Sequence, residues 1–202
     1  MVAAHRVVTV RHGETEWSAD GRHTGHTDIP LDDTGRHQAA LVGRRLEATA
    51  FALVLTSPLQ RARDTCRLAG LGDRAEVDPD LLEWDYGEYD GRTTEDIRRE
   101  RPGWWLWRDG CPGGEQAADV GSRADRVVDR CRQAGGDVAL FAHGHVLRVL
   151  GARWVGTEPT FGSVLLLSTA ALSVLGYERD VPVLVRWNDT AHLEPSLALP
   201  GG

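Results

Sequence analysis

The amino-acid sequence predicts an α/β fold in which one sheet is covered by helices on both faces. Strand-like and helix-like segments alternate along the chain, which is typical of a layered α/β domain. The strand-like segments are apolar at consecutive positions, so both faces of the sheet should be buried. No repeat, low-complexity tract or linker divides the 202 residues, and we expect residues 1–202 to form a single domain.

The N-terminal half should contain two strand–helix units. Residues 5–10 are mostly apolar or β-branched and predict a strand, and the polar stretch 13–33 predicts a long loop. Thr34 begins an amphipathic helix that runs to about residue 48. The apolar run 51–57 predicts a second buried strand, after which Pro58 opens a helix to about residue 69.

The C-terminal half continues the alternation of short apolar runs and amphipathic segments. The predicted elements are a strand at 75–77, helices at 93–101 and 115–134, a strand at 137–145, a helix at 146–155, and strands at 163–175 and 181–187. The stretch between the first two helices is rich in glycine, proline and tryptophan and should be irregular. The polar tail after the last strand is expected to be loosely ordered.

The composition excludes several classes of function. The formal net charge is −7, which argues against a nucleic-acid surface as the main partner. All 23 basic side chains are arginines, which excludes Schiff bases, pyridoxal-phosphate chemistry and phosphate loops that need a lysine. Any anion must therefore be bound by arginine, histidine, hydroxyls or backbone amides.

The cysteines and the N-terminus indicate where the protein works. Cys66, Cys111 and Cys131 are odd in number and scattered, which favours reduced thiols in the cytoplasm. The N-terminus lacks the pattern of a signal peptide, and no apolar run approaches the ~20 residues of a membrane helix. We expect a cytoplasmic protein without a membrane or nucleic-acid partner, with a homodimer as one option for its assembly.

Two of the predicted strands end in the same pair of residues, His-Gly. His12-Gly13 follow the first strand, with Arg11 beside them, and His143-Gly144 follow the run VALFA. In an α/β sheet both pairs would lie in the crevice at the carboxyl edge, where ligands bind. A glycine there lets backbone approach a ligand closely or turn sharply. The alternative is that each histidine merely ends its strand and bonds to a neighbouring carbonyl.

Arg61 is a further candidate because of its place in the helix that follows Pro58. Ser57 suits the N-cap and Pro58 the first helical position, so Arg61 falls in the first or second turn. A cation is mildly unfavourable beside the partial positive charge of a helix N-terminus. An anion held between the helix end and the guanidinium would make the position favourable. The alternative is an ordinary surface arginine.

A third group of candidates lies in the stretch LLEWDYGEYDG. It interleaves four carboxyl groups with aromatic rings: Glu83, Asp85, Glu88 and Asp90 among Trp84, Tyr86 and Tyr89. Acidic loops are usually solvated surface, but large rings would lower the local dielectric and favour the protonated form that a general acid needs. The residue pattern alone does not choose among the four carboxyl groups.

These motifs together resemble the histidine phosphatase superfamily, in its phosphoglycerate-mutase-like branch. The likeness covers nearly the whole chain and rests on motifs in the family's order and spacing: RHGETEW, TGHTDIPLDDTGRHQA, TSPLQRARDT, LLEWDYGEYDG, GCPGGE and AHGH. It implies a three-layer α/β/α sandwich with a mixed, mainly parallel sheet. It also implies an enzyme that needs no metal and no other cofactor.

The resemblance implies a role for individual residues. His12 would be the nucleophile that becomes phosphorylated, Glu83 the proton donor, and His143 part of the phosphate pocket. The expected catalytic residues are His12, Glu83, His143, Arg11 and Arg61. The expected phosphate- and substrate-binding residues are Arg11, Ser18, Thr24, Arg61, Glu83, Trp84, His143 and Gly144.

These residue types suit phosphoryl transfer. Two arginine forks and a protonated His143 would stabilise the charge that spreads over the equatorial oxygens. His12 must present a neutral nitrogen, so its other N–H should be held, we expect by a backbone carbonyl. A protonated Glu83 would give its proton to the leaving alkoxide and then deprotonate the water that hydrolyses the phosphohistidine. Both protonated groups are favoured in mild acid, so we expect an acid pH optimum.

The resemblance favours a phosphatase over a mutase. Mutases of the family typically follow the catalytic glutamate with Arg-His and carry a long basic insertion. Here Trp84-Asp85 stand in that place, and the insertion is short, with Arg108 as its one basic residue. Hydrolysis of phosphomonoesters with broad or sugar-phosphate specificity is expected. A 2,3-bisphosphoglycerate-dependent phosphoglycerate mutase is the alternative, and the Trp104–Trp107 segment would either pack on the core or contact substrate.

Two further hypotheses belong to other classes. The eight histidines, including His143 and His145 on one side of a predicted strand, could serve a metallohydrolase, although acidic partners at ligand spacing are lacking. A non-enzymatic phosphate-sensing or protein-binding module is the other hypothesis. Such a module has no chemical need for both His12 and Glu83. A small-molecule phosphate ester is therefore the expected partner.

Overall fold

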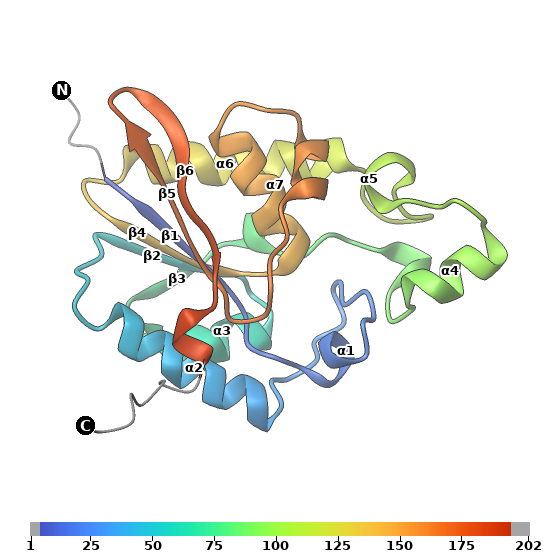
Figure 1. Ribbon diagram of the computed structural model, residues 1–202, viewed down its shortest axis with the longest axis horizontal. Coiled ribbons are helices and arrows are strands. Elements are labelled where there is room, and N and C mark those ends of the chain that lie inside the picture. Colours follow the sequence, from blue (N-terminus) through green and yellow to red (C-terminus); the bar gives the residue numbers. More distant parts are fainter. Residues whose placement is uncertain (1–4, 195–202) are drawn as a thin grey trace, which may run out of the picture.

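The computed structural model describes residues 5–194, in which one sheet lies between layers of helices (Figure 1). The strand order across the sheet is β3-β2-β4-β1-β5-β6. The strands are β1 (Val7–Arg11), β2 (Leu53–Thr56), β3 (Ala75–Val77), β4 (Val138–Ala142), β5 (Leu172–Glu178) and β6 (Val181–Asp189). Each of them overlaps a predicted strand.

The sheet is mixed and mainly parallel, as predicted. β1 pairs with β4, β4 with β2 and β2 with β3, all in parallel, so that Val7 lies opposite Val138. β5 runs antiparallel to β1, and β6 runs antiparallel to β5. β1 and β4 are therefore the two central strands. Helices cover them on both faces of the sheet, and nearly all of their residues are buried.

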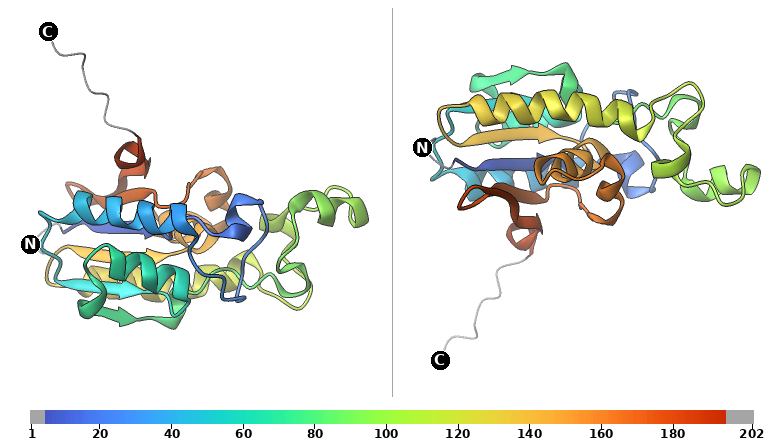
Figure 2. Two further views of the ribbon diagram at one scale, coloured as in Figure 1. Left: turned by 90° about the horizontal axis from the view of Figure 1, so that it is seen from below. Right: turned by 90° about the horizontal axis from the view of Figure 1, so that it is seen from above.

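The helices form the two outer layers. They are α1 (Glu16–Ala19), α2 (Asp33–Leu46), α3 (Gln60–Leu68), α4 (Thr94–Glu100), α5 (Leu106–Asp109), α6 (Ala117–Gln133) and α7 (Gly144–Trp154). α2 and α3 cover one face of the sheet, and α6 and α7 cover the other (Figure 2). Val10 and Phe141 pack in the first layer, whereas Leu140 and Trp154 pack in the second. The predicted α/β/α sandwich is confirmed.

The layers follow from apolar residues at helical spacing. α2 buries Ala39, Val42 and Leu46 on the face that meets the sheet. At its start, Asp32 Oδ1 accepts a hydrogen bond from Gly35 N (2.7 Å), which satisfies one free N–H of the first turn. α4 and α5 do not cover the sheet but extend beyond the carboxyl ends of its parallel strands (Figure 1).

β1 and β4 are adjacent, yet the chain leaves them toward opposite faces. After β1 the next long helix is α2, and β4 continues into α7. In α/β sheets such a divergence opens a crevice at the carboxyl ends of the two strands. A site is therefore expected just after Arg11 and Ala142.

The predicted strand 163–175 is wrong over its first part, since β5 begins at Leu172. The preceding segment forms a 3-10 turn and an irregular arm. Arg148 of α7 donates to Gly162 O (2.9 Å) and Ser163 O (3.0 Å) in this segment. A charged side chain thus takes the acceptors that a neighbouring strand would have used.

The helix predicted to open at Pro58 begins at Gln60 as α3, with Leu59 at the N-cap position. The N–H of Gln60 donates to Asp28 Oδ1 (2.8 Å) instead of to the hydroxyl of Ser57. The predicted cap is wrong because a distant loop supplies the acceptor, and a local pattern does not reveal that loop.

Some limits of the predicted helices and loops also differ. α1 lies within the predicted loop 13–33 and is stabilised by a capping box between Thr15 and Ser18. α5 lies in the tryptophan-rich stretch, and α7 begins at Gly144 instead of residue 146. The end of the predicted loose tail, 195–202, lies outside the described residues. Among the residues described, no helix combines the length and apolar character needed to cross a membrane.

Candidate active site

The parallel pairing of β1 and β4 brings His12 and His143 together. Arg11 lies opposite Ala142 in the ladder, so the next residue of each strand is a histidine. The two ring centroids are 5.2 Å apart, and both side chains are buried. The two His-Gly pairs therefore share one place, as the sequence predicts.

His12 presents one ring nitrogen without a proton. Its Nδ1 lies 2.7 Å from Gly13 O, and because a carbonyl can only accept, Nδ1 carries the hydrogen. Burial lowers the pKa of His12 well below its usual value, and the charges of Arg61 and Arg11 lower it further. The ring is therefore neutral and has its Nε2 lone pair available, with the backbone carbonyl partner that we expected.

The glycines after the two histidines have different roles. A Cβ on Gly13 would lie 2.3 Å from Gly35 O, so Gly13 permits close packing of the end of β1 against α2. A Cβ on Gly144 would lie at ordinary contact distance, 3.5 Å from Arg11 Cζ and 3.6 Å from Glu83 Oε2. Gly13 is therefore required by the fold, whereas the close approach to a ligand stays a prediction for Gly144.

His143 is also neutral, which corrects the expected protonated ring. Its Nδ1 accepts a hydrogen bond from Arg61 Nε (3.1 Å), and its Nε2 lies 2.7 Å from Ser57 Oγ. Because Nδ1 accepts, the proton is on Nε2 and points to the hydroxyl. Burial lowers the pKa of His143 well below its usual value, and the charge of Arg61 adds to the effect. Ser57, expected only as a helix cap, is thus the partner of this histidine.

Arg61 is fully buried and Arg11 is half-buried, and they differ in the donors they leave free. Arg11 Nη1 donates to Leu167 O (2.6 Å), while its Nε is buried and has no hydrogen-bond partner among residues 5–194. Arg61 is more fully used, since Nη1 and Nη2 donate to the carbonyls of Thr27 (3.0 Å) and Gly25 (2.8 Å). Burial lowers the pKa of both guanidinium groups. They remain the cations of the site.

Glu83 is the carboxyl group that the fold brings to the histidines. Oε1 accepts from Trp84 N (2.9 Å) and Val146 N (2.9 Å), and Oε2 accepts from His145 N (3.0 Å). The last two donors belong to the first turn of α7, where N–H groups lack helical partners. The three N–H donors hold both oxygens of the carboxyl group in one position.

A cavity of about 190 Å³ opens above these groups. The expected site residues that line it are Arg11, His12, Ser18, Thr24, Glu83 and Gly144. Arg61 and His143 do not line this cavity and bond to each other beside it. The structure therefore assembles all five expected catalytic residues at one strand edge.

The remaining expected binding residues differ in their availability. Ser18 lines the cavity, but its hydroxyl donates to Thr15 O (3.0 Å) and accepts from Thr15 N (2.9 Å) in the cap of α1. Thr24 lines the cavity too, and its hydroxyl is 3.3 Å from Arg22 O. Trp84 does not line it, because its ring is fully buried against Trp107 and its Nε1 is bonded to a carbonyl of the loop before α6. A substrate contact by the Trp84 ring is therefore not supported.

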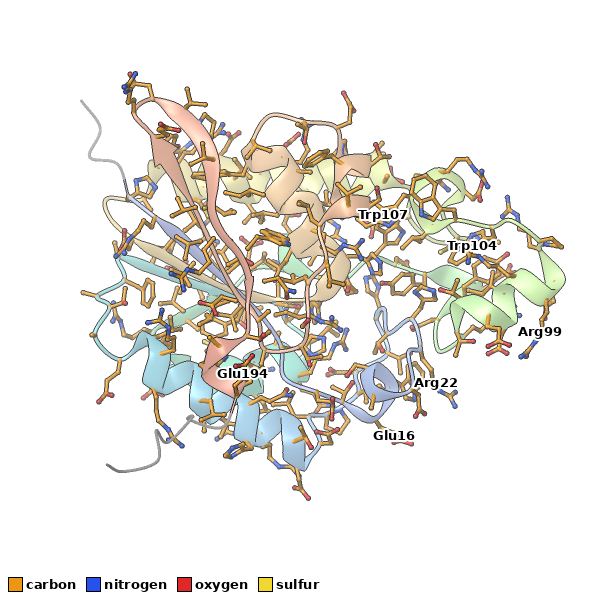
Figure 3. All side chains as sticks on the ribbon, in the orientation of Figure 1. Glu16, Arg22, Arg99, Trp104, Trp107 and Glu194 are labelled. Carbon is orange, nitrogen blue, oxygen red and sulfur yellow. The ribbon has the colours of Figure 1, made fainter. Side chains whose placement is uncertain are left out.

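The Trp104–Trp107 segment mainly packs on the core. Trp104 and Trp107 are buried, and both belong to the larger apolar cluster. Figure 3 shows them where the α4–α5 region joins the rest of the molecule. Trp105 is 43% exposed, and none of the three lines the described cavity. Of the two alternatives, core packing is the one that these positions favour.

Other residues of the cavity are not among the expected site residues. They include Arg22, His23, Tyr86, His145, Arg148 and Leu167. The Tyr86 hydroxyl forms a hydrogen bond with His145 Nδ1 (2.6 Å), and burial lowers the pKa of His23 to about 4. The available signal was the spacing on α7, because Gly144 and Arg148 are one turn apart on the same helical face.

His143 and His145 do not lie in a strand, since α7 begins between them. Within the part of the chain that the structure describes, no group of three or more His, Cys, Asp or Glu side chains is arranged to bind a metal ion.

A neutral buried histidine, two arginines and a carboxylate at the edge of an α/β/α sandwich define a phosphoryl-transfer enzyme. The protein belongs to the histidine phosphatase superfamily (branch 1), whose family model matches residues 7–190. It is thus a hydrolase of the phosphatase type.

Known proteins similar to this chain include phosphatases and mutases. An acid phosphatase of Mycobacterium tuberculosis is 42% identical over 98% of both chains. A sedoheptulose 1,7-bisphosphatase of Saccharomyces cerevisiae is 39% identical over 75% of this chain and 68% of its own. A probable phosphoglycerate mutase of Yersinia enterocolitica is 31% identical over 94% and 95%. The solved structure of the Mycobacterium tuberculosis open reading frame Rv3214 superimposes with a TM-score of 0.86, at 42% identity over 91% and 97%.

Proposed function

We propose that the protein hydrolyses small phosphomonoesters through a phosphohistidine on His12, without a cofactor. The observation that carries this proposal is the state of the His12 ring. Gly13 O holds the Nδ1–H, and burial keeps the ring neutral, so Nε2 is a competent nucleophile. The unpaired Nε of Arg11 supplies a donor for the phosphoryl oxygens in the same cavity.

In the first step His12 Nε2 attacks phosphorus, and the bond from phosphorus to the ester oxygen breaks. Arg11 stabilises the charge on the equatorial oxygens, and the positive charge of Arg61 adds to the effect from beside the cavity. Glu83 gives a proton to the leaving alkoxide, which departs as the alcohol. In this proposal Glu83, which three N–H donors hold in place, carries the proton when the substrate is bound.

In the second step the ionised Glu83 takes a proton from water, which attacks the phosphohistidine. The bond between phosphorus and Nε2 breaks, phosphate leaves, and His12 returns to its neutral form. His143 holds the Arg61 guanidinium in place throughout. The need to protonate Glu83 makes an acid pH optimum part of the proposal.

The remaining lining of the cavity supports a polar substrate of the sugar-phosphate class. Arg22, His23 and His145 line it together with Arg148, whose guanidinium lies 4.8 Å from the centre of the Trp107 ring. Glu83 is the one carboxyl group in the described lining, so the cavity carries net positive charge. The likeness to a bisphosphatase of a sugar supports the same class.

The proposed setting is the cytoplasm. Cys66, Cys111 and Cys131 are free and buried, and burial raises the pKa of each thiol to about 12. Unreactive reduced thiols suit a reducing compartment. The homodimer stays a prediction, which sedimentation of the purified chain tests.

A screen of phosphomonoesters against wild type and His12→Ala tests the proposal. We expect His12→Ala to lose at least about 10³-fold in kcat/KM, and wild type to give an acid-labile phosphoenzyme on rapid quenching. Activity should persist in EDTA. Near-normal turnover by His12→Ala would exclude the covalent route. Interconversion of phosphoglycerates that depends on 2,3-bisphosphoglycerate, with little hydrolysis, would establish the mutase alternative instead.

A further inference from the structure

Arg123 of α6 does not line the cavity. Its guanidinium instead bonds to backbone carbonyls of the segment that ends at Glu83. Nη1 donates to Asp80 O (2.9 Å) and Leu82 O (2.6 Å), and Nη2 donates to Glu83 O (3.1 Å). Nε and Nη2 also donate to the two carboxylate oxygens of Glu115 (2.8 and 3.0 Å). A guanidinium has five N–H groups, so all of them are used here.

Glu115 holds the chain immediately after Glu83. Its Oε2 accepts from Asp85 N (2.9 Å), and its backbone N–H donates to Asp85 O (2.9 Å). Its carbonyl accepts from Trp84 Nε1 (2.9 Å). The Arg123 and Glu115 side chains are 9% and 22% exposed, so water competes little for these bonds. The ion pair therefore fixes the backbone on both sides of Glu83.

The carboxylate of Glu83 is fixed by other partners, at the start of α7. Two of its three N–H donors, on His145 and Val146, belong to that helix. Glu83 is thus anchored at its backbone by the pair on α6 and the loop before it, and at its carboxylate by α7. A group anchored at both ends keeps one position relative to His12, and a displacement of about 1 Å can cost about 10²-fold in rate.

We propose that Arg123 and Glu115 are positioning residues for Glu83 as the general acid, an inference that rests on the proposed function. A role in stability alone is the competing explanation. Burying an ion pair removes two charges from water, and that cost offsets much of their attraction. A gain in stability therefore does not explain why three of the five donors of this buried arginine bond to one short segment that ends at the acid.

The test compares two substrates that differ in their need for an acid. The alkoxide of glycerol phosphate leaves poorly unless it is protonated, whereas the phenolate of para-nitrophenyl phosphate leaves readily. The value of kcat/KM reports on the first step, in which the phosphoryl group is transferred to His12 and the alcohol is released. Arg123→Met and Glu115→Gln should lower it about 10²-fold for glycerol phosphate and about threefold or less for the aryl ester.

Arg130→Met is the matched control. Arg130 lies on the same helix, two turns further along, and pairs with Asp78 (3.0 Å) and Glu76, with no bond to the Glu83 segment. For Arg130→Met, the ratio of the kcat/KM values for the two substrates should equal that of wild type. Equal losses for both substrates, or no loss, in folded Arg123→Met and Glu115→Gln would overturn the inference. If Arg123→Met does not fold, Glu115→Gln decides, because it keeps the size of the side chain and one acceptor oxygen.

Glu83→Gln separates this inference from the proposed function. A selective loss in Glu83→Gln without one in the Arg123 and Glu115 variants refutes the positioning role alone. No selective loss in Glu83→Gln refutes the general acid, and the positioning role with it. If Glu83 is the general acid and Arg123 positions it, adding Arg123→Met to Glu83→Gln should have little further effect. The ratio of kcat/KM values for the two substrates should change by less than about twofold, because the acid that Arg123 positions is already absent.

Discussion

The two hydrogen bonds of His143 fix its protonation state. Arg61 Nε donates to Nδ1, and the hydrogen on Nε2 points to Ser57 Oγ. The ring is fully buried, so either nitrogen without its partner would be an unsatisfied polar group. The positive charge that meets a phosphate in this site is therefore that of arginine, and His143 acts first by orienting Arg61.

Removing the hydroxyl of Ser57 should therefore weaken the site and the fold together. Ser57→Ala leaves a buried ring N–H without an acceptor, which costs about 1–3 kcal/mol. We expect the free energy of unfolding in urea to fall by that amount and kcat/KM to fall about tenfold. Ser122→Ala is the control, because its exposed hydroxyl bonds to Ala118 O (2.9 Å) and its loss should cost less than about 0.5 kcal/mol. Equal stability of Ser57→Ala and wild type would show that the bond to His143 is not formed.

At the scale of elements, the ends of β1 and β4 meet their helices differently. Gly13 allows the end of β1 to approach the first turn of α2, and Gly144 is itself the first residue of α7. The first glycine is thus a packing requirement, and the second faces the phosphate pocket.

Alanine at each glycine should separate these two roles. Gly13→Ala places a Cβ 2.3 Å from Gly35 O, so backbone must move, and we expect a loss of about 1–3 kcal/mol in thermal unfolding. Gly144→Ala meets Arg11 at 3.5 Å and should unfold near the wild-type temperature. Because it narrows the phosphate pocket, its KM should rise about tenfold. A Gly144→Ala variant as unstable as Gly13→Ala would contradict this division.

The elements that sequence predicts best are those whose signals are local. The apolar runs of β1 and β4 carry their His-Gly ends with them, so His12 and His143 could be placed without a structure. The capping role of Ser57 and the first part of the strand 163–175 were predicted wrongly, because the groups that bond to these segments, Asp28 and Arg148, come from elsewhere in the chain. Arg123 has no motif of its own, and its contacts appear once α6 lies against the loop that carries Glu83.

At the scale of the whole molecule, the fold buries several neutral histidines. Burial lowers the pKa of His12, His143 and His145 well below the usual value of 6.5. It lowers the pKa of His23 to about 4. The unfolded chain binds protons at these rings as the pH falls through 6.5, while the folded chain does not. Stability is therefore greatest above that pH and declines below it.

The stability curve should fall as the medium becomes acidic, even though the proposed chemistry favours acid. Each neutral buried histidine contributes about 1.4 kcal/mol per pH unit below the unfolded pKa. Urea unfolding from about pH 7 to pH 4.5 measures the slope. His23→Gln, which can keep a bond to Thr94, should reduce that slope by about one histidine's share. A flat curve, or an unchanged slope in the variant, would show that these rings take up protons in the folded state. As the medium becomes acidic, the initial rate of turnover and the rate of inactivation should therefore both rise. The pH optimum for turnover should lie below the pH at which the protein is most stable.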